Sequence, residues 1–338
     1  MDIQESIKKI KSGEDLFREE IKSIMNLILT GSVSESVIKS FLSSLSTKGE
    51  SIQEVIGSAE VMRELSTKVS VDKKHLVDTC GTGGVGSGIF NVSTTAAFVA
   101  SSCGAKVAKH GNRSATRKSG SADLLETAGV SIELNPEQVK KCIENIGLGF
   151  MFAPSHHSAM KHAIGPRKEL GIKTIFNLLG PLTNPAGALN QVMGVFDRKW
   201  VLPIAEVLKE LGSKNVLVLH SEDGLDEIST AAPTFIAELR NNEIKEYSIS
   251  PSDFGLKVLS IEELKVNSPE QSLKLAKEAL KGENKAAAQM VAMTSGAALY
   301  VADIATSLEE GVEISLQSIN ERTGLKKIEQ LVSFSKSL

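Results

Sequence analysis

Five glycines fall within eight residues, and this cluster constrains the fold more than any other stretch of the chain: Gly81, Gly83, Gly84, Gly86 and Gly88. Leu76 and Val77 are expected to end a short strand before it. Asn91-Val92-Ser93-Thr94 begins an apolar helix over residues 95–103 after it. Since glycine lacks a Cβ, the loop backbone can bend sharply and present its N–H groups to a ligand. Asn, Ser and Thr favour helix N-termini, where free N–H groups attract anions. The strand–loop–helix junction therefore predicts a phosphate site.

Two known phosphate motifs match this loop only weakly. Residues 81–86 satisfy G-x-G-x-x-G, but the dinucleotide motif also needs an acidic residue about 20 positions further on. That region reads Lys106-Val107-Ala108-Lys109 and contains no carboxylate. A P-loop requires Gly-Lys-Ser/Thr, whereas Gly86 is followed by Ser87-Gly88. A loop kept only for its tight turns remains the alternative.

A second polar loop is expected after a strand over residues 105–108. It runs from Lys109 to Ser121 and, after Lys109, carries Arg113, Arg117 and Lys118. Because ligands of open α/β sheets lie at the carboxyl ends of the strands, the two loops should face each other. Ser121 is expected to cap a helix over residues 122–128.

The hydrophobic pattern changes near residue 70 and predicts two units. Residues 1–70 show helical spacing, with capping boxes at Ser32–Glu35 and Ser51–Glu54, which predicts about four helices. From Leu76 onward short apolar strands alternate with helices. We therefore predict an α/β protein: a small all-α N-terminal domain plus a larger α/β domain whose mainly parallel central sheet is flanked by helices. Asn241-Asn242 predicts a hairpin, and Gly296 and Gly311 are expected to interrupt a helical C-terminal region.

Composition narrows the function class. A formal charge of −3 argues against nucleic acid as a partner, and no stretch approaches a membrane span of about 18 apolar residues. The N-terminus is polar and shows no signal peptide, and the three cysteines contain no C-x-x-C. We expect a cytoplasmic metabolic enzyme that binds neither nucleic acid nor membranes.

Three further segments carry candidate site residues. Residues 156–162 hold three histidines, but His157 and His162 are five apart, whereas two helical metal ligands need a spacing of four. Arg167 follows Gly165-Pro166 at the expected opening of a helix, and its guanidinium could bind a carboxylate with two hydrogen bonds or simply face solvent. Asp226 and Glu227 end an acidic loop that is either solvated or able to hold Mg²⁺.

Together these motifs resemble those of the anthranilate phosphoribosyltransferase family. The matching stretches fall in order along most of the chain, at residues 78–84, 91–94, 109–113, 118–123, 167–172, 176–185 and 223–227. The family joins anthranilate to phosphoribosyl pyrophosphate in tryptophan biosynthesis. The resemblance implies Mg²⁺ as cofactor and a homodimer formed through the helical domain. It also implies a helical domain of residues 1–72 joined by roughly 166–190, and a phosphoribosyl-binding domain of residues 73–165 and 191–338.

The resemblance also implies the site residues. Those around phosphoribosyl pyrophosphate are Gly81, Gly84, Val85, Ile89, Asn91, Val92, Ser93, Thr94, Lys109, His110, Gly111, Asn112, Arg113, Ser114, Ala115, Thr116, Arg117 and Ser121. Those around anthranilate are Gly81, His110, Asn112, Pro154, His157 and Arg167. The metal ligands are Ser93, Asp226 and Glu227. Lys109 and Arg167 are expected to position the substrates, and no general base is assigned.

Two positions depart from the family pattern. Val85 stands where the family usually has aspartate, and Ile89 where it usually has threonine. The loss of a carboxylate and a hydroxyl beside the diphosphate predicts weaker binding of magnesium or of the diphosphate. Two alternatives stay open: an enzyme resembling pyrimidine nucleoside phosphorylases, and a non-catalytic relative that binds phosphates or nucleic acid.

Overall fold

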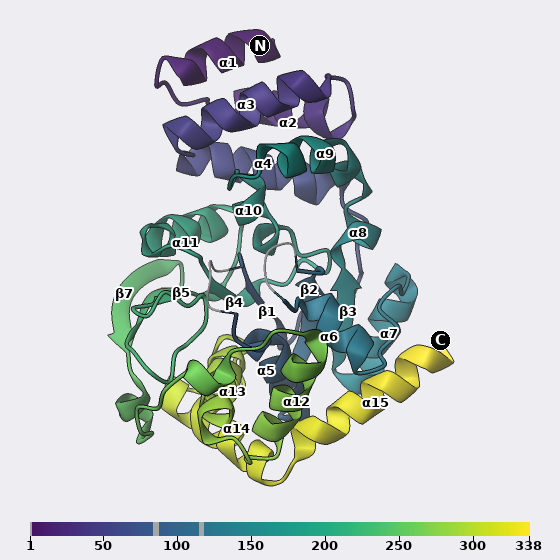
Figure 1. Cartoon of the computed structure of the whole chain (residues 1–338), viewed down its shortest axis with the longest axis vertical. Coiled ribbons are helices and arrows are strands. Elements are labelled where there is room, and N and C mark those ends of the chain that lie inside the picture. Colours follow the sequence, from purple (N-terminus) through teal and green to yellow (C-terminus); the bar gives the residue numbers. More distant parts are fainter. Residues whose placement is uncertain (1, 84–87, 115–117) are drawn as a thin grey trace.

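A computed structural model of the chain describes residues 2–83, 88–114 and 118–338. A bundle of helices caps an α/β unit (Figure 1). The bundle contains α1 (Ile3–Lys11), α2 (Arg18–Leu29), α3 (Glu35–Lys48), α4 (Ile52–Leu65) and α9 (Lys161–Leu170). Although α9 is remote in sequence, it packs against α2 and α3, and its Ala163 is part of their core. The predicted all-α unit is thus present and gains a later helix.

One of the two predicted capping boxes forms. The Ser51 hydroxyl accepts from the Glu54 N–H at 3.3 Å, and the Glu54 carboxylate accepts from the Ser51 N–H at 2.7 Å. The box at Ser32–Glu35 was a wrong prediction, because α3 begins at Glu35 after Ser34, whose side chain makes no cap bond.

The α/β unit is built on a sheet that, within the described residues, has seven strands in the order β3-β2-β1-β4-β5-β6-β7. These strands are β1 (Leu76–Gly81), β2 (Lys106–Gly111), β3 (Leu148–Phe152), β4 (Asn190–Gly194), β5 (Asn215–Ser221), β6 (Thr234–Arg240) and β7 (Glu243–Ile249). The pairs among β1 to β5 are parallel, and β6 and β7 add antiparallel strands at one edge. Asn241 and Asn242 turn the β6–β7 hairpin with φ of 52° and 63°, as their sequence predicted.

Both faces of the sheet are buried under helices. The remaining α-helices are α5 (Val92–Ser102), α6 (Ser121–Thr127), α7 (Pro136–Ile146), α8 (Ala153–His156), α10 (Phe176–Leu179), α11 (Val201–Glu210), α12 (Pro269–Leu280), α13 (Lys285–Val301), α14 (Leu308–Asn320) and α15 (Thr323–Ser337). Short 3₁₀ turns are η1 (Ser158–Met160), η2 (Pro181–Thr183), η3 (Arg198–Trp200), η4 (Pro251–Phe254) and η5 (Glu262–Leu264).

The two faces belong to two hydrophobic cores, which explains why the strands read as continuous apolar runs. Val192 and Leu217 face the core that contains α5 and α13. Met193 and Val218 face the core that contains α11 and the helical bundle. The second core therefore joins the two units of Figure 1. Among the described residues no helix is long and apolar enough to cross a membrane.

Four predicted boundaries were wrong. Leu76 and Val77 begin β1 rather than end it, because the polar residues after Val77 continue the strand to Gly81. Gly120, not Ser121, is the N-cap of α6. Arg167 lies in the last turn of α9 rather than at its opening, since the helix runs through Pro166. Gly296 and Gly311 lie inside α13 and α14, where they let the two helices cross closely.

Candidate active site

The predicted site residues gather at the carboxyl ends of the parallel strands. β1 pairs with β2 on one side and with β4 on the other, so the chain leaves β1 toward β2 and later crosses from β3 to β4 on the opposite side of β1. In open α/β sheets this is the position at which ligands bind. The glycine loop follows β1, and the acidic loop with Asp226 and Glu227 follows β5, the neighbour of β4.

Lys109 lies in the wall of this site rather than in a loop. β2 extends to Gly111, which corrects the predicted strand end at residue 108 and places Lys109 and His110 on the strand. The Lys109 residue is only 2% exposed, and its ammonium donates to the Thr79 carbonyl oxygen at 2.5 Å and to the Ser93 hydroxyl at 3.5 Å. Burial lowers the pKa of the Lys109 ammonium, and the Asp78 carboxylate is the main opposing influence.

Asp78 and Asn184 form a buried hydrogen-bonded pair near Lys109. The Asp78 carboxylate, fully buried in β1, accepts from the His110 N–H at 3.3 Å and from the Asn184 amide at 2.8 Å. The same Asn184 amide donates to the Ala108 carbonyl oxygen at 2.8 Å. Burial raises the pKa of the Asp78 carboxyl, whereas Lys109 acts in the opposite direction. Asn184 thus bridges β1 and β2 at the middle of each strand.

The N-terminus of α5 lies beside Lys109 and the acidic loop. The Thr79 hydroxyl donates to the Ser93 carbonyl oxygen at 3.0 Å, and the Ser93 N–H donates to the Glu227 carboxylate at 3.3 Å. Thr94 on the same turn is 1% exposed, and its buried hydroxyl has no hydrogen-bond partner among the described residues. A free hydroxyl beside a helix N-terminus and a lysine suits an anionic ligand.

Two glycines make room for Asp226. A Cβ on Gly81 would lie 2.9 Å from a carboxylate oxygen of Asp226, and a Cβ on Gly194 would lie 1.8 Å from its carbonyl oxygen. Asp226 is 4% exposed and is therefore held against the ends of β1 and β4. Asp226, Glu227 and Ser93 supply oxygen ligands, which Mg²⁺ prefers.

These donors fit magnesium only together with a substrate. Within the described residues no group of three or more His, Cys, Asp or Glu side chains could hold a metal ion. Mg²⁺ is usually bound through one or two carboxylates plus substrate phosphates and water. Two carboxylates and a hydroxyl beside a phosphate site match that pattern. The residues 156–162 provide no such group, so the weak metal interpretation of their histidines is not supported.

Near its end, at Ser119, the second loop is hydrogen-bonded to the Asn91 side chain. The Asn91 carboxamide donates to the Ser119 carbonyl oxygen at 3.1 Å, and its oxygen accepts from the hydroxyls of Ser119 and Ser272. Ser121 lies against Gly111, where a Cβ would lie 3.0 Å from the Ser121 hydroxyl. Asn91 and Ser121 thus border the same end of the sheet.

Arg113, which the resemblance places around phosphoribosyl pyrophosphate, pairs with carboxylates of α6 in this structure. Its guanidinium donates to both carboxylate oxygens of Glu126, at 2.7 and 2.9 Å, and to Asp123 at 3.3 Å. These contacts with α6 raise the pKa of Arg113, with Glu126 as the largest influence. Arg113 is thus paired with α6, and of the predicted phosphate-binding cations that the structure describes, Lys109 lies within the site.

A cluster of buried histidines lies beside β2 and β3. The rings of His110 and His157 are 5.0 Å apart, and the Nε2 atoms of His110, His156 and His157 are buried without hydrogen-bond partners among the described residues. Burial is the largest cause that lowers the pKa of His157 to about 4 and that of His110 well below its usual range. Pro154 lies one residue into α8, directly after β3. Uncharged rings suit an aromatic ligand.

Arg167 has a guanidinium available for a carboxylate. It is half-buried in the last turn of α9, 5.2 Å from the centroid of the Phe176 ring. It forms no ion pair with any described residue, and burial lowers its pKa. A desolvated arginine without a counter-ion supports the predicted carboxylate site.

Other predicted residues lie apart from these contacts. Ile89 is 3% exposed in the core and forms a bridge with Lys265, while Val92 is fully buried in α5. The oxygen of the Asn112 side chain accepts from the Arg113 N–H, and the Ser114 N–H donates to Asp123. Gly84, Val85, Ala115, Thr116 and Arg117 lie outside the described residues.

Asp78, Thr79 and Asn184 were not predicted as site residues. Asp78 and Thr79 are polar residues that directly follow the apolar residues of β1, and that position hinted at a strand end facing a ligand. Asn184 precedes a proline, so its sequence suggested only a turn.

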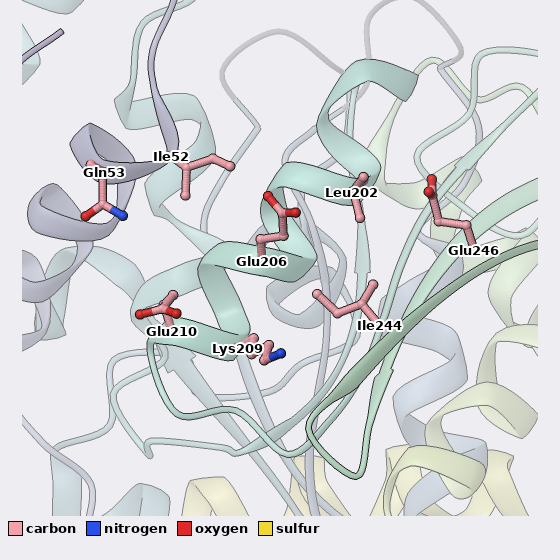
Figure 2. A pocket seen from close by; sticks show the side chains of 8 residues that line it. All are labelled: Ile52, Gln53, Leu202, Glu206, Lys209, Glu210, Ile244 and Glu246. Carbon is pink, nitrogen blue, oxygen red and sulfur yellow. The ribbon is translucent and has the colours of Figure 1, made fainter.

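A separate surface pocket of about 540 Å³ lies between α4, α11 and β7 (Figure 2). Its lining residues are Ile52, Gln53, Leu202, Glu206, Lys209, Glu210, Ile244 and Glu246. None is a predicted site residue, and three of the charged ones are glutamates, which would repel phosphate. We therefore do not assign it to the substrates.

Comparison with known proteins agrees with this geometry. Residues 4–66 match the helical bundle domain of a glycosyl transferase family, and residues 73–324 match the a/b domain of that family. The chain is 54% identical over 339 residues to the anthranilate phosphoribosyltransferase of Ectopseudomonas mendocina, which covers 99% of this chain and 97% of that protein.

Two solved structures share the whole fold. The crystal structure of anthranilate phosphoribosyltransferase from Thermus thermophilus matches with a TM-score of 0.92 and 42% identity, covering 99% of this chain and 100% of that one. The enzyme from Saccharomyces cerevisiae, solved in complex with PRPP and Mg, matches with a TM-score of 0.90 and 26% identity, covering 99% and 98% of the two chains.

Proposed function

The chain belongs to the anthranilate phosphoribosyltransferase family, and from this premise we propose how its residues carry out the family's reaction. The enzyme transfers the phosphoribosyl group of phosphoribosyl pyrophosphate to the amine of anthranilate, with Mg²⁺ as cofactor. The products are phosphoribosylanthranilate and pyrophosphate, on the route to tryptophan. The observation that carries our assignment of the site is the convergence of Lys109, Ser93 and Glu227 at the carboxyl end of the sheet.

We assign the diphosphate to the glycine loop, the N-terminus of α5 and Lys109. The unpartnered Thr94 hydroxyl, the Ser93 hydroxyl and the buried ammonium offer three donors to phosphate oxygens. Ser93, Asp226 and Glu227 would hold Mg²⁺, which supplies positive charge against the departing pyrophosphate. Asn91 and Ser121 would border the phosphoribosyl group, as the family resemblance implies.

We assign anthranilate to the space between the histidine cluster and Arg167. Neutral His110 and His157, with Pro154, would contact the aromatic ring. Arg167 would bind the carboxylate, because it is desolvated and lacks another counter-ion among the described residues. Gly81 and Asn112 would lie where the two substrates meet.

The chemistry needs little covalent help from these side chains. The bond between the ribose anomeric carbon and the pyrophosphate oxygen breaks, while the amine nitrogen of anthranilate forms a bond to the opposite face of that carbon. The protein holds both substrates in line and stabilises the negative charge that develops on pyrophosphate. We assign no general base for the amine proton.

The reaction is tested by following anthranilate fluorescence. Adding enzyme, magnesium and phosphoribosyl pyrophosphate should consume anthranilate, and chelating the magnesium should stop the consumption. A folded enzyme that leaves anthranilate unchanged would contradict the function. Phosphate-dependent cleavage of pyrimidine nucleosides would then be measured, because it distinguishes the nucleoside phosphorylase alternative.

We further propose a homodimer formed through the helical unit. Two large apolar side chains of that unit face solvent, Phe17 at 73% and Ile164 at 57% exposure, and such groups favour a protein interface. Light scattering of the purified protein, and of Phe17→Ser and Ile164→Ser variants, tests the proposal. A wild-type protein that stays monomeric at micromolar concentration would contradict it.

We also propose the domain division implied by the resemblance, with residues 1–72 and about 166–190 on the helical side. The packing of α9 on α2 and α3 supports this division and favours a connecting segment that begins with α9 at Lys161. Residues 73–165 and 191–338 form the phosphoribosyl-binding side. A cytoplasmic location stays a prediction from the sequence.

A further inference from the structure

Lys173 bridges the helical unit and the sheet. It lies between α9 and α10, and its carbonyl oxygen accepts from the Ser46 hydroxyl of α3 at 2.9 Å, which fixes its backbone to the helical unit. Its ammonium lies 3.6 Å from the centroid of the Phe196 ring, and Phe196 is the second residue after β4. This distance is well within the range of a cation–π contact.

The contact continues into the glycine loop. The Phe196 N–H donates to the Thr82 hydroxyl oxygen at 2.9 Å, and the Thr82 N–H donates to the Gly194 carbonyl oxygen at 2.9 Å. Thr82 is the first residue of the loop that follows β1. Lys173, Phe196 and Thr82 therefore form a continuous series of contacts from the helical unit to the start of the phosphate-binding loop.

Two carboxylates near Lys173 follow strands at the carboxyl edge of the sheet. Partial burial lowers the pKa of its ammonium, whereas the carboxylates of Asp197 and Asp226 act in the opposite direction. Asp226 is one of the proposed metal ligands. Lys173 is thus a cation from the helical unit that lies within electrostatic reach of the magnesium and phosphate site.

We propose that Lys173 is a positioning residue for phosphoribosyl pyrophosphate, which acts by holding Phe196 and thereby Thr82 and the start of the glycine loop. The inference rests on the proposed function. It assigns the helical unit a part in donor binding that is separate from the Arg167 contact with the acceptor. Because the diphosphate is assigned to this loop and anthranilate only to Gly81 at its start, loss of the Lys173 contact should weaken mainly the donor side of the reaction.

The first test compares Lys173→Met with Lys173→Arg. We expect Lys173→Met to raise the KM for phosphoribosyl pyrophosphate about 2- to 5-fold, the range given by an exposed cation–π contact. The KM for anthranilate should stay unchanged. Lys173→Arg should keep near wild-type values, because a guanidinium also stacks on an aromatic ring. Lys199→Met is the matched control: its ammonium lies 6.0 Å from the Trp200 ring and its side chain is 69% exposed.

A double-mutant cycle and an exchange measurement separate this role from a general structural one. If Lys173 acts through Phe196, Lys173→Met should add little to the effect of Phe196→Leu. The Phe196 amide should also exchange its hydrogen faster in Lys173→Met than in wild type. Additive kinetic effects, an unchanged KM or unchanged exchange would each overturn the inference. A wild-type enzyme that does not consume anthranilate would overturn the proposed function, and the exchange measurement would still decide whether Lys173 holds Phe196.

Discussion

Gly194 approaches Asp226 so closely that a Cβ on the glycine would lie 1.8 Å from the Asp226 carbonyl oxygen. Real Cβ atoms essentially never come within 3.0 Å of another heavy atom in this way. The end of β4 therefore needs a residue without a side chain, so that the acidic loop can reach the proposed metal site. Gly81 does the same at the end of β1, where a Cβ would crowd the Asp226 carboxylate at 2.9 Å.

We predict that Gly194→Ala impairs magnesium-dependent activity. The backbone of Asp226 must move by more than 1 Å to clear a methyl group, and a displacement of that size at an active site costs on the order of 100-fold in rate. The kcat/KM should be measured at several magnesium concentrations, with far-UV circular dichroism to verify folding. A folded variant with a wild-type magnesium dependence would contradict the predicted role of this glycine.

The helices α13 and α14 also approach closely at two glycines. At this contact we predict that a substitution lowers stability rather than activity. A Cβ on Gly311 would lie 2.4 Å from the Gly296 carbonyl oxygen, so Gly311→Ala forces the helices apart. Overpacking of this kind costs about 1–3 kcal/mol, offset in part by the better helix propensity of alanine. Urea unfolding should show a lower free energy of unfolding and unchanged KM values.

Gly165→Ala in α9 is the matched control for that experiment. Its Cβ would meet only the Glu35 carboxylate tip at 3.2 Å, and this flexible group can move aside. Its stability should be equal to wild type or higher. An equal loss of stability in both variants would mean that close helix crossing is not the cause.

The sequence predicted the edge of the sheet that carries the site, but not the contacts that complete it. The glycine cluster and Asn91 predict a strand, a loop and a helix, and the structure has them in that order. Gly296 and Gly311 were misread as interruptions because local propensity penalises glycine in helices, whereas the crossing that requires it is a tertiary contact. Lys109 was misplaced in a loop because a charged residue seldom lies in a buried strand unless partners such as Asp78 compensate it. Such partners are not visible in local sequence.

Arg167→Lys should weaken anthranilate binding. A lysine keeps the charge but cannot give the two parallel hydrogen bonds of a guanidinium to a carboxylate. Hydrogen bonds to charged groups contribute about 1.5–3 kcal/mol, which predicts a rise of roughly 10- to 150-fold in the KM for anthranilate. Arg198→Lys is the control, because Arg198 stacks on Phe235 at 3.5 Å and is not a predicted site residue. A similar rise in the KM for phosphoribosyl pyrophosphate would argue against a carboxylate site.

His157 should make the protein less stable as the pH falls. Its folded-state pKa is lowered from 6.5 to about 4, chiefly by burial, so between these values the unfolded chain binds a proton that the folded chain does not. The free energy of unfolding therefore falls as the pH drops from 6.5 toward 4, by on the order of 3 kcal/mol for this one group. His110 and His156, whose pKa values are also lowered, act in the same direction. Urea unfolding of wild type and His157→Asn between pH 7 and pH 4.5 measures the contribution of His157 together with its influence on the pKa of His110. The variant should lose less stability over this range, and parallel curves would show that His157 does not titrate as its burial implies.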